Sequence, residues 1–530
     1  MADLLKIYHR LPYSAKVLVA GARGRYLNRW RYGAETEPMV AEFLAHDRWS
    51  DEQWRDWREE RLAMILRRAA ADVPYYREQW ARRRAAGDTS SPEVLANWPI
   101  LTKEEVRKSP RAFLADDCDP KAMYYEHTSG TSGKPLHIWL SKATVREWFA
   151  LFEARSRRWY GVSRADRWAI LGGQLVAPVD RERPPFWVWN SGLNQLYLSA
   201  YHLTPANIAA YLEALKKHEV RYLLGYPSGL YRLAQQVIES GMPAPRLAVA
   251  IGNAEPLLDH QRAVIAAAFG CPVRETYGMA EIAAAAGECE MGRLHAWPEA
   301  GHIEIVSDTA DEPVPVGEAG RLIATGLMNR DMPLVRYETG DRAALGEGAC
   351  ACGRTLPILK GIEGRVDDVV ITRDGRHIGR LDPVFKADIP IREAQLIQEE
   401  LDLIRVLYVP TDAYTPQDGE MLAQRIRDRT GDDMRVVLEA VDAVPRTANG
   451  KFRAVISRVS VHDVAQDATG PGRYCPANTA KTSRPITKTP TSRWPAPSPP
   501  GAGSCSTASC PPATRPDSPS PWRASSGWAV

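Results

Sequence analysis

Several features that would place the chain in a simple class are missing from its 530 residues. No run of about 18 uninterrupted apolar residues occurs, which excludes a membrane-spanning helix. The most apolar early stretch, Lys16 to Ala22, is short and has no signal-peptide pattern, so secretion is not expected. Eight cysteines are too few for a disulfide scaffold in a chain of this length. We therefore expect a cytoplasmic protein of two or three domains.

Charge of either sign is nearly balanced as well. The formal net charge is +3, and residues 465–530 hold seven Lys or Arg and two Asp or Glu, so the rest sums to 3 − 5 = −2. Such a body has no general electrostatic footprint for nucleic acid. The first 33 residues are basic, and apolar residues lie between the charges. This segment is compatible with an anionic membrane surface, but we favour a helix packed on its own domain.

The middle of the chain alternates strand-like and helix-like segments. Residues 51–84 have helical spacing, and a shorter helical piece lies between Pro99 and Pro110. The alternating segments are Trp168–Leu171, Pro205–Lys217, Arg221–Gly225, Leu230–Ser240, Leu247–Gly252 and Leu258–Phe269. This order predicts an α/β fold with largely parallel sheets.

The pattern changes near Gly364. A hairpin is predicted around the turn Asp374-Gly375, followed by a strand, a helix and a strand at Leu403–Val409, Gly419–Arg429 and Arg435–Val441. We predict a large N-terminal domain, 1–364, whose first 120 residues are mostly helical, and a small α+β domain, 365–462. The tail, 463–530, is rich in Pro, Ser, Thr, Ala and Gly, so disorder is expected.

One stretch has the composition of a phosphate-binding loop. Residues 124–135 read YYEHTSGTSGKP, in which hydroxyl side chains alternate with Gly130 and Gly133. Glycines expose backbone N–H groups and the hydroxyls add donors, so the loop could wrap phosphate oxygens. It is not a Walker A loop, because its glycines are too close together and Pro135 follows Lys134. Taken alone, it could equally be a flexible Ser/Gly turn.

Four later motifs, in a characteristic order, make the interpretation of residues 128–135 as a phosphate-binding loop more specific. They are ETYGMAE at 275–281, RYETGD at 336–341, GRVDD at 364–368 and PRTANGKFR at 445–453. Together with the loop at 128–135, they resemble the signatures of the adenylate-forming, AMP-binding superfamily. GNAEP at 252–256 and CACGRTLP at 350–357 are similar to the phenylacetate–coenzyme A ligase branch and its relatives from capsule-polysaccharide clusters.

The resemblance implies a fold and a reaction. The fold would be a large adenylate-forming domain with mixed or parallel sheets and helices, plus a small mobile α+β lid. The reaction would be attack of a carboxylate on the α-phosphorus of ATP with release of pyrophosphate, then acyl transfer to coenzyme A. Negative charge grows on the phosphate oxygens, so a metal and a cation are needed. The implied ligands are ATP or AMP, Mg²⁺, coenzyme A and a small carboxylic acid, and we also consider a homodimer.

The resemblance assigns three residues to catalysis. Lys451 would bridge the carboxylate and the α-phosphate, Glu281 would bind Mg²⁺, and Arg365 would assist near the ribose and phosphates. One residue departs from the family pattern, because Ala280 stands where many relatives carry a hydroxyl group. Loss of one hydrogen bond to the α-phosphate, about 1.5–3 kcal/mol, is expected to weaken activity without abolishing it.

Other matching residues would hold the nucleotide or move the lid. Tyr277 would stack on adenine, Asp341 would accept hydrogen bonds from both ribose hydroxyls, and Asp367 would be the hinge between the domains. Each residue type, met singly, is usually a surface or packing group, and only the order of the motifs supports these roles. The remaining cofactor-binding candidates are Thr128, Ser129, Gly130, Thr131, Ser132, Gly133, Lys134, Ala254, Glu255, Pro256 and Gly278.

Three cysteines and a histidine form a second pattern. Cys289, His295, Cys350 and Cys352 are the donor set of a closed tetrahedral zinc site, which is structural and not catalytic. Some members of the phenylacetate-type branch resemble this arrangement. The alternative is ordinary reduced thiols beside a loop histidine, since the long gap from His295 to Cys350 is less diagnostic than a CxxC pair. We favour zinc.

The acid is the least determined part of the reaction. Candidate pocket segments are Trp187–Trp189, Tyr222–Gly229 and Gly252–Ala254, whose aromatic and glycine content suggests an apolar slot for an aromatic acid. These aromatics could equally be core. Two other functions stay open: transfer of the acyl group to an amine, and a non-catalytic nucleotide-binding scaffold in polysaccharide assembly. Whether product formation requires coenzyme A distinguishes the ligase from transfer to an amine. If no acid in a broad panel supported pyrophosphate exchange, the non-catalytic scaffold would be favoured.

Overall fold

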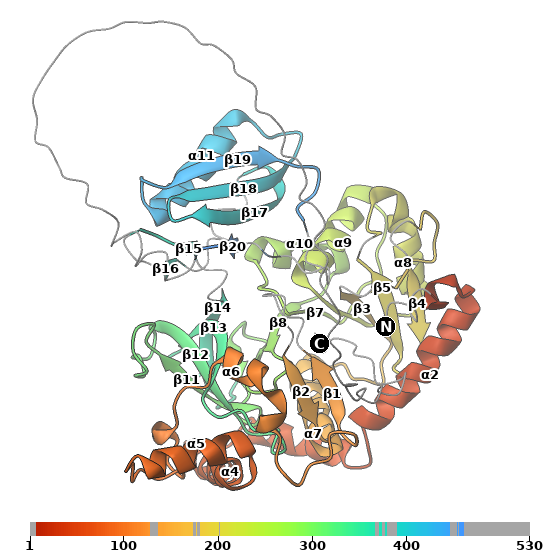
Figure 1. The fold of residues 1–530 in the computed structure, drawn as a ribbon. Helices are drawn as coiled ribbons and strands as arrows, with labels where there is room; N and C mark the ends of the chain where they lie inside the picture. The colour runs from red at the N-terminus through yellow and green to blue at the C-terminus, as the bar shows by residue number, and fades with distance from the viewer. Residues whose placement is uncertain are drawn as a thin grey trace, which may run out of the picture.

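The computed structural model describes residues 7–127, 136–172, 176–177, 181–200, 202–365, 370–373, 377–378, 389–445, 453 and 455–459. Its largest element is a twelve-stranded sheet with helices packed around it (Figure 1). The strands are β3 Trp168–Gly172, β4 Trp187–Asn190, β5 Gln195–Ser199, β6 Tyr222–Gly225, β7 Val249–Asn253, β8 Val273–Gly278, β9 Ala285–Glu288, β10 Leu294–Ala296, β11 Gly301–Val306, β12 Ala319–Gly326, β13 Tyr337–Leu345 and β14 Ile358–Arg365. The predicted α/β fold class is confirmed.

Only part of this sheet is parallel. The order is β11-β12-β13-β14-β10-β9-β8-β7-β6-β3-β5-β4, and the pairs from β8 to β5 are parallel. Helices α8 Ile208–Lys217, α9 Pro227–Ser240 and α10 Asp259–Phe269 supply the crossovers that parallel pairing needs. From β8 to β11 every neighbouring pair is antiparallel. The sheet is thus mixed, as predicted for the large domain: the alternating segments from β3 to β8 build its parallel part, and β4 and the strands after β8 pair antiparallel.

Side chains on the central strands alternate between two cores, one on each face of the sheet. Trp168 and Ile170 of β3 join one core with the N-terminal helices, whereas Ala169 and Leu171 join the other core with helices α8 to α10. This alternation with a period of two is that of strands buried on both faces. The loops that follow these central strands are thus carried on a sheet that is packed on both faces.

The helices from α2 to α7 come before strand β3 in the chain. They are α2 Tyr13–Arg31, α3 Thr36–His46, α4 Asp51–Asp72, α5 Pro74–Ala85, α6 Lys103–Lys108 and α7 Lys142–Ser156. The helical segment predicted at 51–84 is two helices, because Val73 is extended and Pro74 starts the second. Proline has no N–H to continue a helix but fits its first position.

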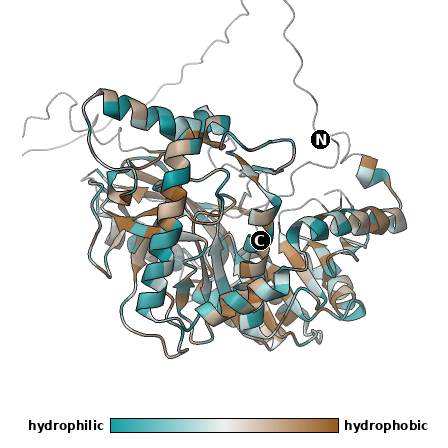
Figure 2. Ribbon diagram, turned by 90° about the horizontal axis from the view of Figure 1, so that it is seen from below, coloured by the Kyte–Doolittle hydropathy of each residue, from teal (hydrophilic) through white to brown (hydrophobic). Residues whose placement is uncertain are grey.

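Helix α2 packs on its own domain, as we favoured from the sequence. Gly21 and Gly24 face the turn after β4, and a Cβ at Gly24 would lie 1.9 Å from Oδ1 of Asn190. None of the helices in the described ranges is long and apolar enough to cross a membrane. Hydrophilic and hydrophobic residues alternate along these helices (Figure 2).

The predicted phosphate loop connects two paired strands. Strands β1 Tyr124–His127 and β2 His137–Leu140 are antiparallel, and His127 is in register with His137. Residues 128–135, which contain all the loop candidates from Thr128 to Lys134, lie outside the described residues.

The C-terminal segment has a sheet and a core of its own. Strands β17 Ile391–Glu400, β18 Leu403–Pro410, β19 Arg435–Ala440 and β20 Val455–Ser457 pair in the order β19-β18-β17-β20, with helix α11 Pro416–Thr430 beside them (Figure 1). The hairpin strands β15 Val370–Ile371 and β16 His377–Ile378 match the predicted hairpin. The buried cluster of this segment runs from Val370 to Val455 and includes no residue of the large sheet. The sequence did not reveal β17 and β20.

Candidate active site

Two tyrosine hydroxyls join the two central motifs of the sequence. Tyr277, near the end of β8, donates to Oδ2 of Asp341 in β13 at 2.7 Å. Tyr337, at the start of β13, donates to Oε1 of Glu281 at 2.9 Å. The structure thus brings together Tyr277, Glu281 and Asp341, three of the predicted site residues. Tyr277 and Glu281 lie at and just after the carboxyl end of β8, the last parallel strand, which is the usual place for ligands in such sheets, and Asp341 of β13 meets them there.

The Glu281 carboxylate is buried and faces a cation. Glu281 is 5% exposed, and Nζ of Lys103 lies 3.0 Å from its Oε1. Burial raises the pKa of the Glu281 carboxyl, but the Lys103 ammonium together with the hydrogen bonds from Lys103, Tyr337 and the backbone outweighs burial and holds that pKa below its ordinary value. An ionised carboxylate that already balances a positive charge is a donor of the kind that Mg²⁺ takes. The residues present therefore fit the predicted metal.

Asp341 is held in place by its own strand. Gly340, at φ +79°, precedes it, and the backbone N–H of Asp341 donates to Oγ1 of Thr339 at 3.1 Å. Since positive φ favours glycine, the backbone conformation explains why a glycine stands at this position of the RYETGD motif. A register shift follows Asp341, whose partner across the ladder is Arg365. The backbone of Arg365 thus lies beside Asp341, and the role of Arg365 near the ribose and phosphates stays a prediction.

The segment after β7 contributes a helix cap. Ala254 has φ +63°, and Glu255 accepts a hydrogen bond from the backbone N–H of Ser228 at 3.1 Å. Ser228 is in the first turn of α9, where a carboxylate balances unpaired N–H groups. The structure therefore gives Glu255 a capping role; with Ala254 and Pro256 it stays a cofactor-binding prediction. Gly278 ends β8 beside the Trp148 ring, which a Cβ there would meet at 3.7 Å.

Other predicted residues lie outside the described part of the chain. These are the phosphate-loop residues Thr128 to Lys134, the hinge Asp367 and the catalytic Lys451. Their roles stay predictions.

The sequence did not single out Lys103 or Tyr337. Lys103 opens α6, and the ion pair with Glu281 links positions 178 residues apart, which no local pattern shows. Tyr337 stands inside the quoted RYETGD motif, so its position was visible although its contact with Glu281 was not.

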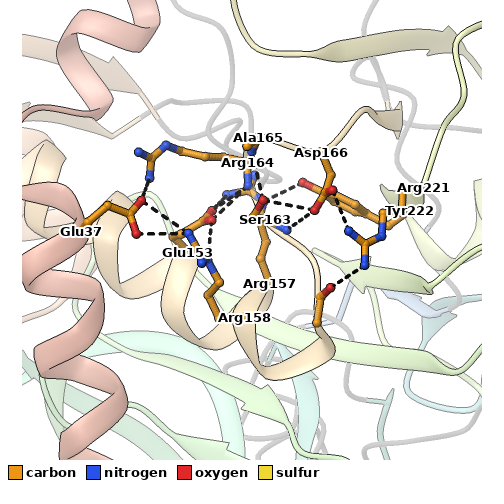
Figure 3. Close-up of polar contacts among 11 residues, drawn as sticks. Glu37, Glu153, Arg157, Arg158, Ser163, Arg164, Ala165, Asp166, Arg221 and Tyr222 are labelled. Atoms are coloured by element: carbon orange, nitrogen blue, oxygen red, sulfur yellow. Dashed lines mark hydrogen bonds and ion pairs between the residues drawn. The ribbon is translucent and has the colours of Figure 1, made fainter.

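Tyr222 belongs to the core, which corrects one of the predicted pocket segments. It is fully buried, its ring stacks on Trp168 at 5.7 Å, and its hydroxyl accepts from Nε of Arg157 at 2.8 Å. Arg157 also pairs with the buried Glu153 at 3.1 Å (Figure 3). Because buried hydroxyls and charges need such partners, this cluster satisfies core polar groups.

The tryptophans of β4 are also packing residues. Trp187 lies edge-on to Tyr211 and Trp189 stacks on His218, both beside α8. Since β4 is the edge strand, β5, β3, β6 and β7 separate it from β8. Trp187 and Trp189 thus fit the alternative that these aromatics are core, and an acid pocket formed by residues 223–229 and 252–254 stays a prediction.

A cavity of about 490 Å³ lies away from this site, between α3, α4, α7 and residues 328–331. Apolar side chains such as Phe43 and Trp57 line it together with the charged groups of Arg61 and Glu147. None of the predicted site residues in the described ranges lines it.

The predicted zinc ligands converge. The donor atoms of Cys289, His295, Cys350 and Cys352 all lie within 4.8 Å of one another. The two sulfurs of Cys289 and Cys350 are 3.7 Å apart, and Sγ of Cys352 lies 3.5 Å from Nε2 of His295. A tetrahedral ion with Zn–S bonds of about 2.3 Å and Zn–N bonds of about 2.0 Å places such atoms about 3.5–3.8 Å apart. The geometry fits a zinc ion.

The histidine of this cluster is oriented for a metal. Nδ1 of His295 lies 3.1 Å from the carbonyl oxygen of Leu356, so the protonated Nδ1 donates and Nε2 faces the thiols. Burial lowers the pKa of His295, which favours the neutral ring that metal binding needs. The four residues come from the β9–β10 region and the loop after β13, so an ion here would tie these two segments together.

Comparison with known proteins identifies the family. Residues 54–329, more than half of the chain, match the family model described as AMP-binding enzyme. The chain belongs to the AMP-binding enzyme family. The superfamily resemblance drawn from the five motifs is thereby confirmed, and residues 370–458 match the CapK C-terminal domain model.

Named relatives of this AMP-binding enzyme span most of both chains. Protein CapK of Staphylococcus aureus is 25% identical over 391 residues, covering 73% of this chain and 85% of that protein. Phenylacetate–coenzyme A ligase of Thermus thermophilus is 25% identical over 448 residues, covering 76% and 96%. The crystal structure of a 2-hydroxyisobutyryl-CoA ligase in the postadenylation state has a TM-score of 0.58 at 19% identity and covers 80% of this chain and 93% of that chain. It shares the fold.

Proposed function

We propose that this AMP-binding enzyme is an ATP-dependent carboxylate–coenzyme A ligase. The carboxylate oxygen attacks the α-phosphorus of ATP, the bond to the β-phosphate breaks, and pyrophosphate leaves. The coenzyme A thiol then loses its proton, its sulfur attacks the acyl carbon, and AMP leaves. The observation that carries the proposal is the pair of tyrosine hydrogen bonds that joins Tyr277 to Asp341 and Tyr337 to Glu281.

Each described residue has a task in the first step. Tyr277 offers an aromatic face for adenine, and the Asp341 carboxylate offers two acceptor oxygens for the ribose hydroxyls. Glu281 would hold Mg²⁺, which supplies positive charge at the phosphate oxygens. The backbone of Arg365 stands opposite Asp341 in the ladder, which supports the proposal that Arg365 assists near the ribose and phosphates.

The remaining tasks fall on residues assigned by motif. The hydroxyls and N–H groups of residues 128–134 would hold the β- and γ-phosphates. Lys451 would place its ammonium between the carboxylate and the α-phosphate, where charge develops. Asp367 would let the C-terminal domain turn, so that Lys451 leaves and the thiol enters.

The relatives support a coenzyme A ligase and leave the acid as a proposal. We propose an aromatic or branched small acid, because relatives of this chain are named phenylacetate–coenzyme A ligase and 2-hydroxyisobutyryl-CoA ligase. The pocket would lie between residues 223–229 and 252–254, whose strands β6 and β7 are neighbours. Tyr226, at the start of α9, is the aromatic residue of this pair of segments.

The structural metal is part of the same proposal. Cys289, His295, Cys350 and Cys352 would bind one zinc ion, which stabilises the loops between β9 and β14. Because the set supplies four ligands and no open position, zinc would take no part in catalysis.

The proposal is tested by product analysis with the full chain. The protein is incubated with MgATP and a panel of arylacetic, benzoic, hydroxy and branched acids, with and without coenzyme A, and AMP, pyrophosphate and thioester are measured. We expect acid-dependent pyrophosphate release and a thioester that requires coenzyme A. Glu281→Gln should lose both, whereas Glu219→Gln, an exposed matched control, should keep both.

The acceptor and the hinge are separated by the same assay. Product that forms with amines and not with coenzyme A would replace the ligase by an amide synthetase, and no pyrophosphate with any acid would indicate a nucleotide-binding scaffold. Asp367→Pro should keep acyl-adenylate formation and impair thioester formation. Equal loss of both half-reactions would contradict the hinge role.

A further inference from the structure

The chain that leads into α6 is hydrogen-bonded to the start of β13. The backbone N–H of Leu101 donates to the carbonyl of Arg336 at 2.9 Å, and the N–H of Glu338 donates to the carbonyl of Leu101 at 2.9 Å. Leu101 thus forms a parallel bridge with Tyr337. The N-terminal segment is therefore joined to β13 by an isolated bridge at Tyr337, beside the centre of the site.

The start of α6 is fixed as well. The Thr102 hydroxyl accepts from the backbone N–H of Glu105 at 3.3 Å, and the Glu105 carboxylate accepts from the N–H of Thr102 at 2.9 Å. Tyr75 donates to the same carboxylate at 2.8 Å. This capping box sets the helix start at Lys103. The backbone of Lys103 is therefore placed, and only its side chain is left to move.

The Lys103 side chain covers a buried carboxylate. Its Nζ lies 3.0 Å from Oε1 of Glu281 and 6.0 Å from the centre of the Tyr337 ring. The Lys103 side chain is 23% exposed, against 4% for Glu281. The ammonium is thus the more accessible partner, and a ligand that approaches Glu281 from solvent meets Lys103 beside it.

A purely structural ion pair would not need this arrangement. Breaking a buried pair destabilises a fold because one charge is left without a partner, but Lys103 is partly exposed and carries a long flexible stem. If Glu281 binds Mg²⁺, the ammonium loses its counter-charge while the metal brings phosphate oxygens to the same place. An ammonium is a strongly hydrated point charge that binds phosphate well.

We propose that Lys103 is a nucleotide-binding residue, which pairs with Glu281 in the free enzyme and turns to the β- and γ-phosphates of ATP when the carboxylate takes Mg²⁺. This inference rests on the proposed function and extends it. It gives the N-terminal helical region a direct part in the site and predicts selective recognition of ATP and pyrophosphate over AMP.

The test compares nucleotides by calorimetric binding to the full chain. Lys103→Met should weaken MgATP binding about 10- to 100-fold, as expected for a hydrogen bond to a charged group, and leave AMP binding within about threefold. Lys103→Arg, which keeps the charge, should lose less. Lys108→Met, an exposed lysine on the same helix, should bind both nucleotides like the wild type.

A second measurement uses the wild-type protein, in case Lys103→Met does not fold. Amine-modifying reagent and mass spectrometry should show Lys103 labelled in the free enzyme and protected by MgATP or magnesium pyrophosphate, but not by AMP. Unchanged MgATP affinity, equal weakening for AMP and MgATP, or equal protection by AMP would overturn the proposal. A wild-type protein that binds neither nucleotide would instead overturn the proposed function itself.

Discussion

The hydroxyl of Tyr277 lies 2.7 Å from Oδ2 of Asp341, although the two residues are 64 positions apart in the sequence. This contact places the residue assigned to adenine beside the residue assigned to ribose. Both are partly exposed and so accessible to a ligand. In a nucleoside the base and the ribose are likewise neighbours, joined by the glycosidic bond. One nucleoside could therefore contact Tyr277 with its base and Asp341 with its ribose hydroxyls.

Asp341 should set the preference for ribose over 2′-deoxyribose. The wild type is expected to bind ATP about tenfold more tightly than 2′-deoxyATP, because the deoxy sugar leaves one acceptor of the carboxylate unused. Asp341→Asn should bind ATP more weakly and reduce this preference to within about threefold. Asp311→Asn, an exposed control, should keep it. Competition binding measures both ratios, and an undiminished preference in Asp341→Asn would contradict the assignment.

The cysteine–histidine cluster should hold one zinc ion per chain. Cys350→Ser removes one of four ligands, so zinc content and the unfolding temperature should both fall, since metal binding adds to folding free energy. Cys118→Ser removes a thiol outside the cluster and should change neither. Elemental analysis and thermal unfolding provide the measurements. Well under one zinc per wild-type chain would contradict the site.

A buried ion cluster should account for part of the stability of the large sheet. Arg155 is fully buried and pairs with Glu299 at 2.6 Å and with Asp47 at 3.1 Å. Arg155→Met should destabilise the fold by about 3–5 kcal/mol, because it leaves buried carboxylates unpaired. Arg167→Met breaks an exposed pair with Glu219 and should cost at most about 1 kcal/mol. Urea unfolding compares the two, and equal effects would contradict the account.

The same cluster predicts a dependence on pH. Burial raises the pKa of Glu299, but Arg155 together with the hydrogen bonds from His46 and the backbone outweighs burial and holds that pKa below its ordinary value of 4.5. A lowered pKa contributes stability that is present above pH 4.5 and is lost as pH falls through the folded value. The difference in stability between wild type and Arg155→Met should therefore shrink in acid below pH 4.5. A constant difference would contradict it.

The packing of α2 should depend on Gly24. A Cβ there would lie 1.9 Å from Oδ1 of Asn190, which itself accepts from the N–H of Gly192 at 3.1 Å. Gly24→Ala should destabilise by about 1–3 kcal/mol, the usual cost of overpacking. Gly229→Ala in α9 would place its Cβ 3.5 Å from Leu171, an ordinary contact, and should be neutral or stabilise by up to about 1 kcal/mol. Stabilisation by Gly24→Ala would show that α2 is not docked there.

Patterns within short stretches of sequence predicted the elements whose structure depends mainly on neighbouring residues. The alternation from β3 to β8 predicted the parallel half of the sheet, and the motif order predicted three residues that meet at the site. The antiparallel half escaped prediction because its strands are joined without helices, and β17 because charges at Glu393, Glu399 and Glu400 interrupt its apolar pattern.

Contacts over long sequence distances were beyond such patterns. Lys103 and Glu281 are neighbours in a fold that also pairs Leu101 with Tyr337, a contact between distant parts of the chain. Tyr222 looked like a pocket aromatic, and only the fold shows its hydroxyl held by Arg157 within the core. The zinc donor set could be proposed from residue types alone, because three cysteines and one histidine are a known set of ligands for structural zinc.

The central claim is that one nucleotide binds where the β8 and β13 motifs meet. A crystal structure with AMP bound tests it most directly. We predict that the adenine lies against Tyr277, that the ribose hydroxyls donate to Asp341, and that the phosphate points toward Glu281. AMP in the cavity between α3, α4 and α7, or anywhere else away from Tyr277 and Asp341, would contradict the account.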